Sequence, residues 1–180
     1  MRQVKGSMFL IFAKVINADK KGTYDKYLTD QDRAVLSKLV LPSNWYPFET
    51  YKNCFLAVSQ VVVNNNPEKL KDWGRDFAES TLTTIYKSLL LKKDAQSALD
   101  AYKLQLKNQF NFGKVDSEMV SENEMIITIE DFDNTFEPWF HVAIGWLERL
   151  IQLVIKKPVR SEFLKRSWQG GPATVFKMSW

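Results

Sequence analysis

The feature that most constrains this chain is the segment Pro138–Ile155, which is almost uniformly apolar. Its non-apolar residues, Arg149 apart, recur at spacings of four, three and four, so they form one narrow stripe along a helix. A helix this apolar must be covered on most of its sides. We expect it inside a folded domain, with the stripe facing solvent or a neighbouring subunit: His141, Gly145, Glu148 and Gln152.

The hydrophobic period changes on both sides of this helix. Earlier in the chain, apolar residues recur every three or four positions, which predicts several helices. Apolar residues at every second position predict one β-hairpin over Lys114–Ile129 and a second over Val159–Trp180, with its turn at Gln169–Pro172. Helices first and strands afterwards indicate an α+β fold. We expect a four-stranded antiparallel sheet in ββαββ order, with Pro138–Ile155 covering one face.

Capping and breaking residues predict where the earlier helices lie. Thr29 and Asp32 have the spacing of a capping box, and the apolar stripe of that helix continues to Val40. Pro47 is expected in the first turn of the next helix. A long helix is predicted from Pro67 to Leu89.

Glycines interrupt two of the predicted helices, Gly74 in one and Gly145 in the other. A glycine inside a helix costs about 1 kcal/mol relative to alanine. We expect close approach of the two helices to offset this cost. Aromatic side chains near that crossing are our candidates for the lining of a ligand pocket, with plain core packing as the alternative. They are Trp73, Phe77, Trp139, Phe140 and Trp146.

Composition limits the class of protein. A chain of 180 residues that is 45% hydrophobic can bury a full core, which excludes intrinsic disorder. No linker, repeat or composition shift divides it, so we expect one domain over residues 1–180. No apolar run reaches the roughly 18 residues of a membrane span. No cleavable signal is recognisable at the start, which predicts a cytoplasmic protein. The single cysteine, Cys54, allows no internal disulfide and is predicted to be a buried thiol.

The residues offer little material for catalysis. His141 is the only histidine, which excludes sites with several histidine ligands and leaves one candidate general base. A small enzyme that uses His141 with a nearby acid is therefore our alternative prediction. We predict no catalytic residue and no metal ligand as the leading interpretation.

The net charge of +4 comes with scattered basic residues. A further alternative is weak nucleic-acid binding through one C-terminal basic cluster. Aromatic residues do not alternate with these charges on an evident strand face, so we do not expect nucleic acid as a partner. The cluster consists of Lys156, Lys157, Arg160, Lys165 and Arg166.

The order of the elements and several short motifs resemble one superfamily. It groups 4-vinyl reductase-like domains, haem-nitric-oxide-binding domains and the TRAPP trafficking subunits. Within it, the chain is most similar to a bacterial branch found in myxobacteria and related deltaproteobacteria. The motifs are Trp45-Tyr46-Pro47, Trp73-Gly74 with Ala78, Gly145-Trp146, and Trp168–Pro172 followed by Thr174, Phe176, Met178 and Trp180.

The resemblance implies a cytoplasmic regulatory module that binds an apolar small molecule, a lipid chain or a protein partner, often as a homodimer. The haem-binding relatives use a proximal histidine with a Tyr-x-Ser-x-Arg motif, and this sequence lacks that motif. Vinyl-reductase-like domains often place cysteines near the final hairpin, where this chain has none. We therefore predict a non-catalytic apolar-ligand- or partner-binding regulatory module with no cofactor.

Overall fold

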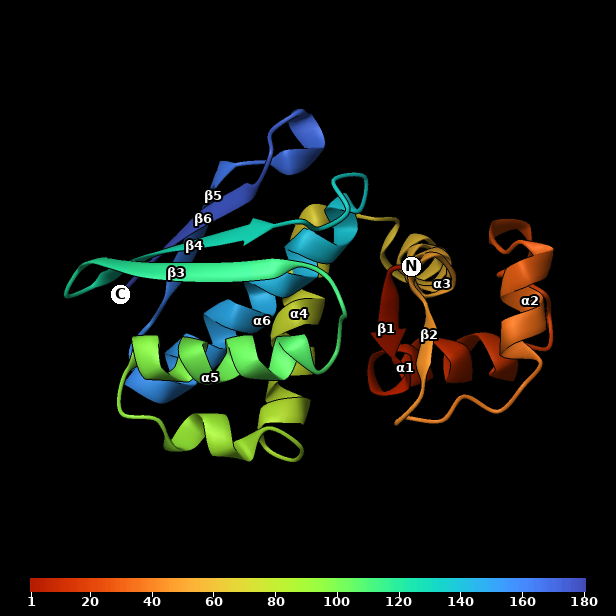
Figure 1. Cartoon of the computed structure of the whole chain (residues 1–180), viewed down its shortest axis with the longest axis horizontal. Helices are drawn as coiled ribbons and strands as arrows, with labels where there is room; N and C mark the ends of the chain where they lie inside the picture. The colour runs from red at the N-terminus through yellow and green to blue at the C-terminus, as the bar shows by residue number, and fades with distance from the viewer. The chain divides into compact units, whose positions relative to one another are not determined.

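The computed structural model describes all residues from Met1 to Trp180, which cluster into two compact units (Figure 1). The first unit contains Met1–Asn66 and Lys107–Phe112. The second contains Pro67–Leu106 and Gly113–Trp180. No helix in either unit has the length and hydropathy that crossing a membrane requires.

The first unit is mainly helical. Its elements are β1 (Gln3–Lys5), α1 (Gly6–Ala18), a 3-10 turn η1 (Asp25–Tyr27), α2 (Asp30–Leu36), β2 (Trp45–Pro47) and α3 (Phe48–Val63). The second unit carries the sheet. Its elements are α4 (Pro67–Leu82), η2 (Lys87–Leu91), α5 (Ala95–Lys107), β3 (Lys114–Ser121), β4 (Glu124–Glu130), α6 (Glu137–Ile155), β5 (Arg160–Lys165), η3 (Ser167–Gln169) and β6 (Thr174–Ser179).

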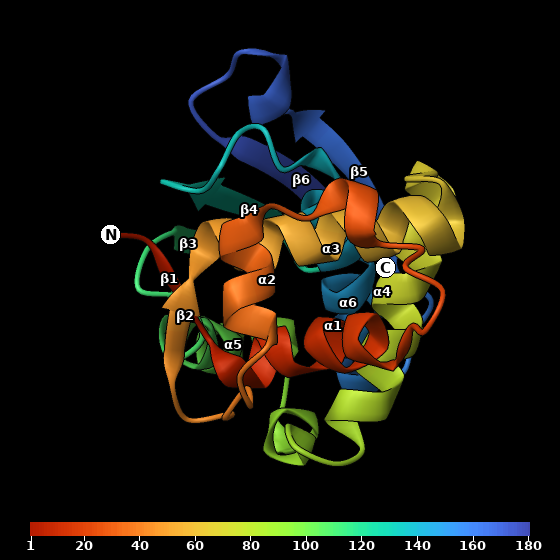
Figure 2. The same ribbon diagram turned by 90° about the vertical axis from the view of Figure 1, so that its right-hand side faces the viewer.

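An aromatic core holds the first unit together. Phe12 of α1 meets Tyr51 of α3 edge-on at 5.7 Å between ring centroids, and Phe55 lies 5.2 Å from Phe12. The short strands β1 and β2 pair antiparallel and lie side by side in both ribbon views (Figures 1 and 2). Apolar side chains at helical spacing on α1 and α3 thus bury one face of each helix against the other.

The second unit contains the predicted antiparallel sheet, in the strand order β3-β4-β6-β5. The two C-terminal hairpins join through β4 and β6, so β3 and β5 are the edge strands. Alternate residues of the central strands are buried and stand directly opposite one another, because side chains of a strand point to opposite faces in turn. The opposed pairs are Met125 with Met178, Ile127 with Phe176, and Ile129 with Thr174. The α+β prediction and the ββαββ order are confirmed.

Three predicted helix boundaries need correction. The capping box of Thr29 and Asp32 is present, but α2 ends at Leu36, and Leu39 is 81% exposed. Pro47 does not lie in the first turn of α3. It is the extended N-cap residue, and it ends β2.

The helix predicted to reach Leu89 ends at Leu82 and leaves Ile85 74% exposed. Hydroxyls of serine and threonine residues in the last turn of α4 and directly after it donate hydrogen bonds to carbonyls of the preceding turn. This side-chain bonding competes with the helix backbone and accompanies the end of the regular helix.

The predicted meeting of the two glycine-bearing helices is confirmed. A Cβ built on Gly74 would lie 2.1 Å from the carbonyl oxygen of Val142, and one built on Gly145 would lie 2.0 Å from that of Lys71. Such distances leave no room for any side chain. The backbones of α4 and α6 therefore touch at this crossing, and the glycines are required by contact between helices.

We expect Gly145→Ala to destabilise the protein by about 3 kcal/mol, because the new methyl group must push α6 away from a backbone oxygen that cannot swing aside. Urea denaturation followed by circular dichroism measures the change. Gly171→Ala is the matched control, since a Cβ there meets nothing closer than 3.5 Å. Equal stability of the two variants would contradict the close crossing.

Candidate functional site

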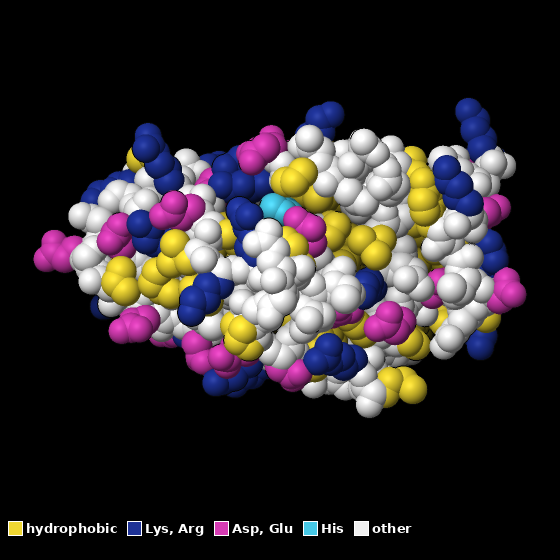
Figure 3. Space-filling view, turned by 90° about the horizontal axis from the view of Figure 1, so that it is seen from above, with side chains coloured by type: hydrophobic (Ala, Val, Ile, Leu, Met, Phe, Trp, Pro, Cys, Tyr) yellow, Lys and Arg dark blue, Asp and Glu magenta, His cyan; other side chains and the backbone are white.

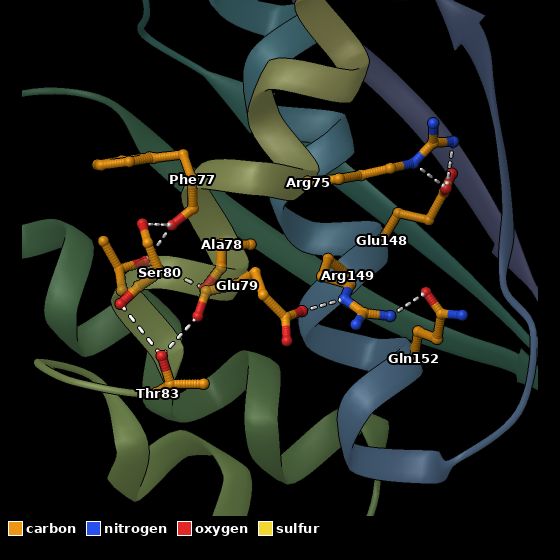
Figure 4. A network of polar contacts seen from close by, with 10 residues as sticks. Arg75, Phe77, Ala78, Glu79, Ser80, Thr83, Glu148, Arg149 and Gln152 are labelled. Atoms are coloured by element: carbon orange, nitrogen blue, oxygen red, sulfur yellow. Dashed lines mark hydrogen bonds and ion pairs between the residues drawn. The ribbon is translucent and has the colours of Figure 1, made fainter.

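A buried carboxylate joins α6 to α4 and to β5. Glu148 is 5% exposed, and its Oε1 accepts hydrogen bonds from Arg75 Nε at 2.9 Å and Arg75 Nη2 at 2.6 Å. Its Oε2 lies 2.9 Å from Lys71 Nζ and also accepts a hydrogen bond from Ser161 Oγ of β5. Figure 4 shows Arg75 reaching from α4 to this carboxylate. Every oxygen of the buried charge thus has partners, as burial of a carboxylate requires.

A second ion pair joins the same two helices: Glu79 lies one turn beyond Arg75 on α4, and Arg149 directly follows Glu148 on α6. Arg149 Nε donates to Glu79 Oε2 at 2.6 Å, and Arg149 Nη1 donates to Gln152 Oε1 at 3.0 Å (Figure 4). Together with the bridge of Glu148, this pair fixes how α6 is rotated about its own axis. The predicted solvent-facing stripe is therefore wrong at Gly145 and Glu148, because partners from α4 and β5 cover both residues.

The opposite end of α6 carries a group of stacked rings, which we call the α6 aromatic cluster. Phe132 stacks on Trp139 at 4.1 Å, and Phe140 stacks on Trp168 at 5.2 Å between ring centroids. Phe163 of β5 meets Trp168 edge-on at 5.2 Å. The cluster consists of Phe132, Trp139, Phe140, His141, Phe163 and Trp168.

The structure separates the residues that the sequence proposed as a pocket lining. Trp139 and Phe140 are buried neighbours in the α6 aromatic cluster, 5.4 Å apart. Trp146 belongs to another group, where it lies 4.9 Å from Tyr102 and donates through Nε1 to Thr81 Oγ1 at 3.2 Å.

The other two candidates, Trp73 and Phe77, are half-buried on α4. Figure 4 shows the ring of Phe77 directed away from α6. Any ligand role of these five residues remains a prediction.

Three further rings complete the cluster, and the sequence patterns did not predict them as site residues. Trp168 comes from the turn between β5 and β6, Phe163 from an edge strand, and Phe132 from the connection that leads into α6. Each lies many residues away from Phe140 or on another element. The tryptophan in the closing motif was the available signal, because a large ring beside a glycine-rich turn must bury its surface somewhere.

His141 is the polar member of the cluster. Its ring lies 5.2 Å from Phe163 and 5.7 Å from Trp168, and Nε2 is 3.4 Å from Glu137 Oε1. Burial is the largest effect and lowers the pKa of His141, while the nearby Glu137 opposes that shift. The imidazole is therefore neutral near pH 7. It remains visible at the surface between acidic, basic and hydrophobic side chains (Figure 3).

The side chains that could bind haem iron through nitrogen or a thiolate do not fit that role. Nε2 of His141 lies 3.4 Å from Glu137 Oε1, and its ring lies beside those of Phe163 and Trp168. Cys54 has no exposed surface, and burial together with the charge of Asp32 raises the pKa of its thiol to about 12. No group of three or more His, Cys, Asp or Glu side chains is placed to hold a metal ion.

Comparison with solved structures finds the same fold in H-NOX proteins. An H-NOX protein from S. oneidensis, crystallised in the Fe(II)NO ligation state, matches 97% of this chain and 98% of its own, with a TM-score of 0.68 and 11% identity. An unliganded Fe(II) H-NOX protein from K. algicida matches 97% of this chain and 95% of its own, with a TM-score of 0.66 and 12% identity. A mutant form of the T. tengcongensis H-NOX matches 97% of this chain and 96% of its own, with a TM-score of 0.64 and 14% identity.

These matches extend over nearly the whole chain, so this protein has the H-NOX fold. No protein-family model and no curated protein matches the sequence. At such low identity the likeness concerns the backbone arrangement alone.

We expect Glu148→Gln to lower the free energy of unfolding by about 3 kcal/mol at pH 7, because it leaves Lys71 and Arg75 without their buried countercharge. Urea denaturation measures this loss. Glu79→Gln is the matched control, because its ion pair with Arg149 is half-exposed and contributes under about 1 kcal/mol. Equal losses in the two variants would contradict the special role of Glu148.

The loss of stability caused by Glu148→Gln should also depend on pH. Burial by itself raises the pKa of Glu148, but hydrogen bonds from Lys71, Ser161 and Arg75 together hold it below the ordinary 4.5. A carboxylate with a depressed folded-state pKa stabilises the protein above its unfolded-state pKa, and this contribution is lost as the pH falls through the folded-state value. The difference between wild type and Glu148→Gln should therefore be constant near neutral pH and shrink below pH 4.5.

Proposed function

We propose that this chain is a non-catalytic regulatory module that binds a small apolar molecule at the α6 aromatic cluster. One observation carries the proposal: the chain has the fold of a ligand-binding family over nearly its whole length, while its only imidazole is engaged within the protein. The proposed module spans residues 1–180 as one functional domain, which the full-length structural matches support.

The chemistry of the α6 aromatic cluster supports an apolar ligand. Apolar sites are lined by aromatic walls with few polar groups. Trp168, Phe163 and Phe132 are each half-buried, so their rings keep surface that a ligand can cover. Every buried polar side-chain atom already has a hydrogen-bond partner, so no unsatisfied buried donor calls for a polar ligand.

The proposal does not extend to haem-bound gas. The S. oneidensis neighbour was crystallised in an Fe(II)NO ligation state. In this chain His141 and Cys54 do not offer an axial ligand, as described above. The homodimer, the cytoplasmic location and the myxobacterial branch stay predictions.

Native mass spectrometry of protein purified without detergent tests the ligand proposal. We expect an additional mass on the wild-type chain that organic extraction removes, and the same spectrum reports whether the chain is a dimer. Trp168→Ala should lower the affinity about tenfold, since an aromatic wall contributes about 1 kcal/mol or more. Trp45→Ala is the control, because this partly exposed ring belongs to the other unit. A ligand-free wild-type chain, or equal occupancy in both variants, would refute the proposal.

Absorbance spectroscopy tests the exclusion of haem separately. After incubation with haemin and desalting, we expect no stoichiometric Soret band, because neither His141 nor Cys54 is available to the iron. The control is His141→Leu, which should give the same spectrum as wild type. A stoichiometric Soret band that this substitution removes would show that the imidazole does bind haem.

A further inference from the structure

Strand β5 presents an unpaired edge of the sheet. On one side it pairs with β6 from Arg160 to Lys165, and no strand pairs with its other side. An open edge carries backbone N–H and C=O groups in the spacing that another extended chain can match. The register slips between Phe163 and Lys165, and Leu164 at this bulge is 49% exposed. The edge therefore offers both backbone partners and an apolar contact.

Five basic side chains near the ends of β5 have no acidic partner. Two groups stand at the two ends of the strand, and none of their side chains forms an ion pair. Glu162, the acid within the strand, is already paired with Lys177 at 2.9 Å. The cations are Lys156, Lys157 and Arg160 at one end, and Lys165 and Arg166 at the other.

The other edge strand shows that this charge pattern is not a general property of the sheet. Lys114 at the start of β3 lies 3.1 Å from Asp116 and 3.6 Å from Glu130, so its charge is balanced locally. Lysines on an edge can serve merely to prevent association between sheets. At β3 one lysine with acidic partners accompanies the edge, whereas at β5 the charges without an ion-pair partner are all positive and lie at the two ends of the strand.

We propose that β5 is a docking edge for an extended acidic segment of a partner protein, which adds a strand to the sheet. A strand of six residues is roughly 20 Å long, which exceeds the screening length of about 8–10 Å at physiological salt. The two cation groups therefore act separately, and the segment that fits them is acidic at both ends and apolar between them. This inference goes beyond the proposed ligand binding and does not depend on it.

A peptide fits this edge better than a nucleic acid does. A polypeptide backbone can continue the hydrogen-bond ladder of β5, and a phosphate backbone cannot. Binding of single-stranded nucleic acid relies on aromatic rings free to stack on bases. Between the two cation groups, the exposed large apolar residue is Leu164, which has no ring to stack on a base.

Fluorescence anisotropy with a labelled nonapeptide tests the proposal. The probe carries two glutamates at each end and alternating valine and threonine between them. We expect it to bind wild type, and we expect a copy with alternate backbone nitrogens methylated to bind at least about tenfold more weakly, because it cannot donate to the strand. Equal binding of the two peptides would overturn the proposal, since only charge attraction would remain.

Charge-reversed variants locate the site. Arg160→Glu with Lys165→Glu should weaken the probe at least about tenfold. Lys92→Glu with Lys93→Glu changes the net charge equally on an exposed loop and should leave the affinity within about twofold. Equal losses in both double variants would contradict a site at β5.

Hydrogen exchange on the wild-type chain tests the site without any substitution, so the result does not depend on whether a variant folds. With the peptide bound, amides of Arg160–Lys165 should gain protection and those of Lys114–Ser121 should not. Absence of protection at β5 would refute the docking edge. Tighter binding of a single-stranded oligonucleotide than of the peptide, lost in the β5 variant, would replace the proposal with a nucleic-acid site.

Discussion

The contact of two backbones at Gly74 and Gly145 is the constraint on which the second unit depends. Because neither residue has a side chain, α4 and α6 approach closely enough for Arg75 to reach Glu148. That carboxylate then binds Ser161 and ties α6 to the edge strand β5. The same placement of α6 brings its other end against Phe163 and Trp168. The close approach of α4 and α6 therefore accounts both for the hydrogen bonds of Glu148 and for the α6 aromatic cluster.

The fold and its chemistry are separable in this protein. A backbone arrangement shared with H-NOX proteins persists at 11 to 14% identity, because many side-chain sets can fill the same core volume. The groups that would define a haem site are individual side chains in particular places, and nothing in the fold preserves them. Here Nε2 of the only imidazole lies 3.4 Å from Glu137 Oε1, and two aromatic rings lie beside it. This is why a shared backbone arrangement does not by itself identify a ligand for this chain.

Local signals predicted most elements correctly. The capping box at Thr29, the proline that starts α4 and the alternation in both hairpins act within a few residues, so the chain carries them wherever it folds. The errors arose where a periodic pattern continued past the true end of a helix. Leu39 and Ile85 fit the apolar period, but no other element packs over them, and both are exposed. Periodicity identifies the apolar face of a helix, but it does not show how far along the chain other elements pack over that face.

The sequence by itself determined the α+β class, the order of the strands along the chain and the need for two glycine-bearing helices to meet. Those features follow from propensity, period and the cost of glycine, which all operate along the chain. Only the tertiary structure decided that Glu148 faces two cations on α4, that Trp146 belongs to another group than Trp139, and that five cations flank a free strand edge. These depend on pairings between residues far apart in the chain, and no local spacing specifies the partner.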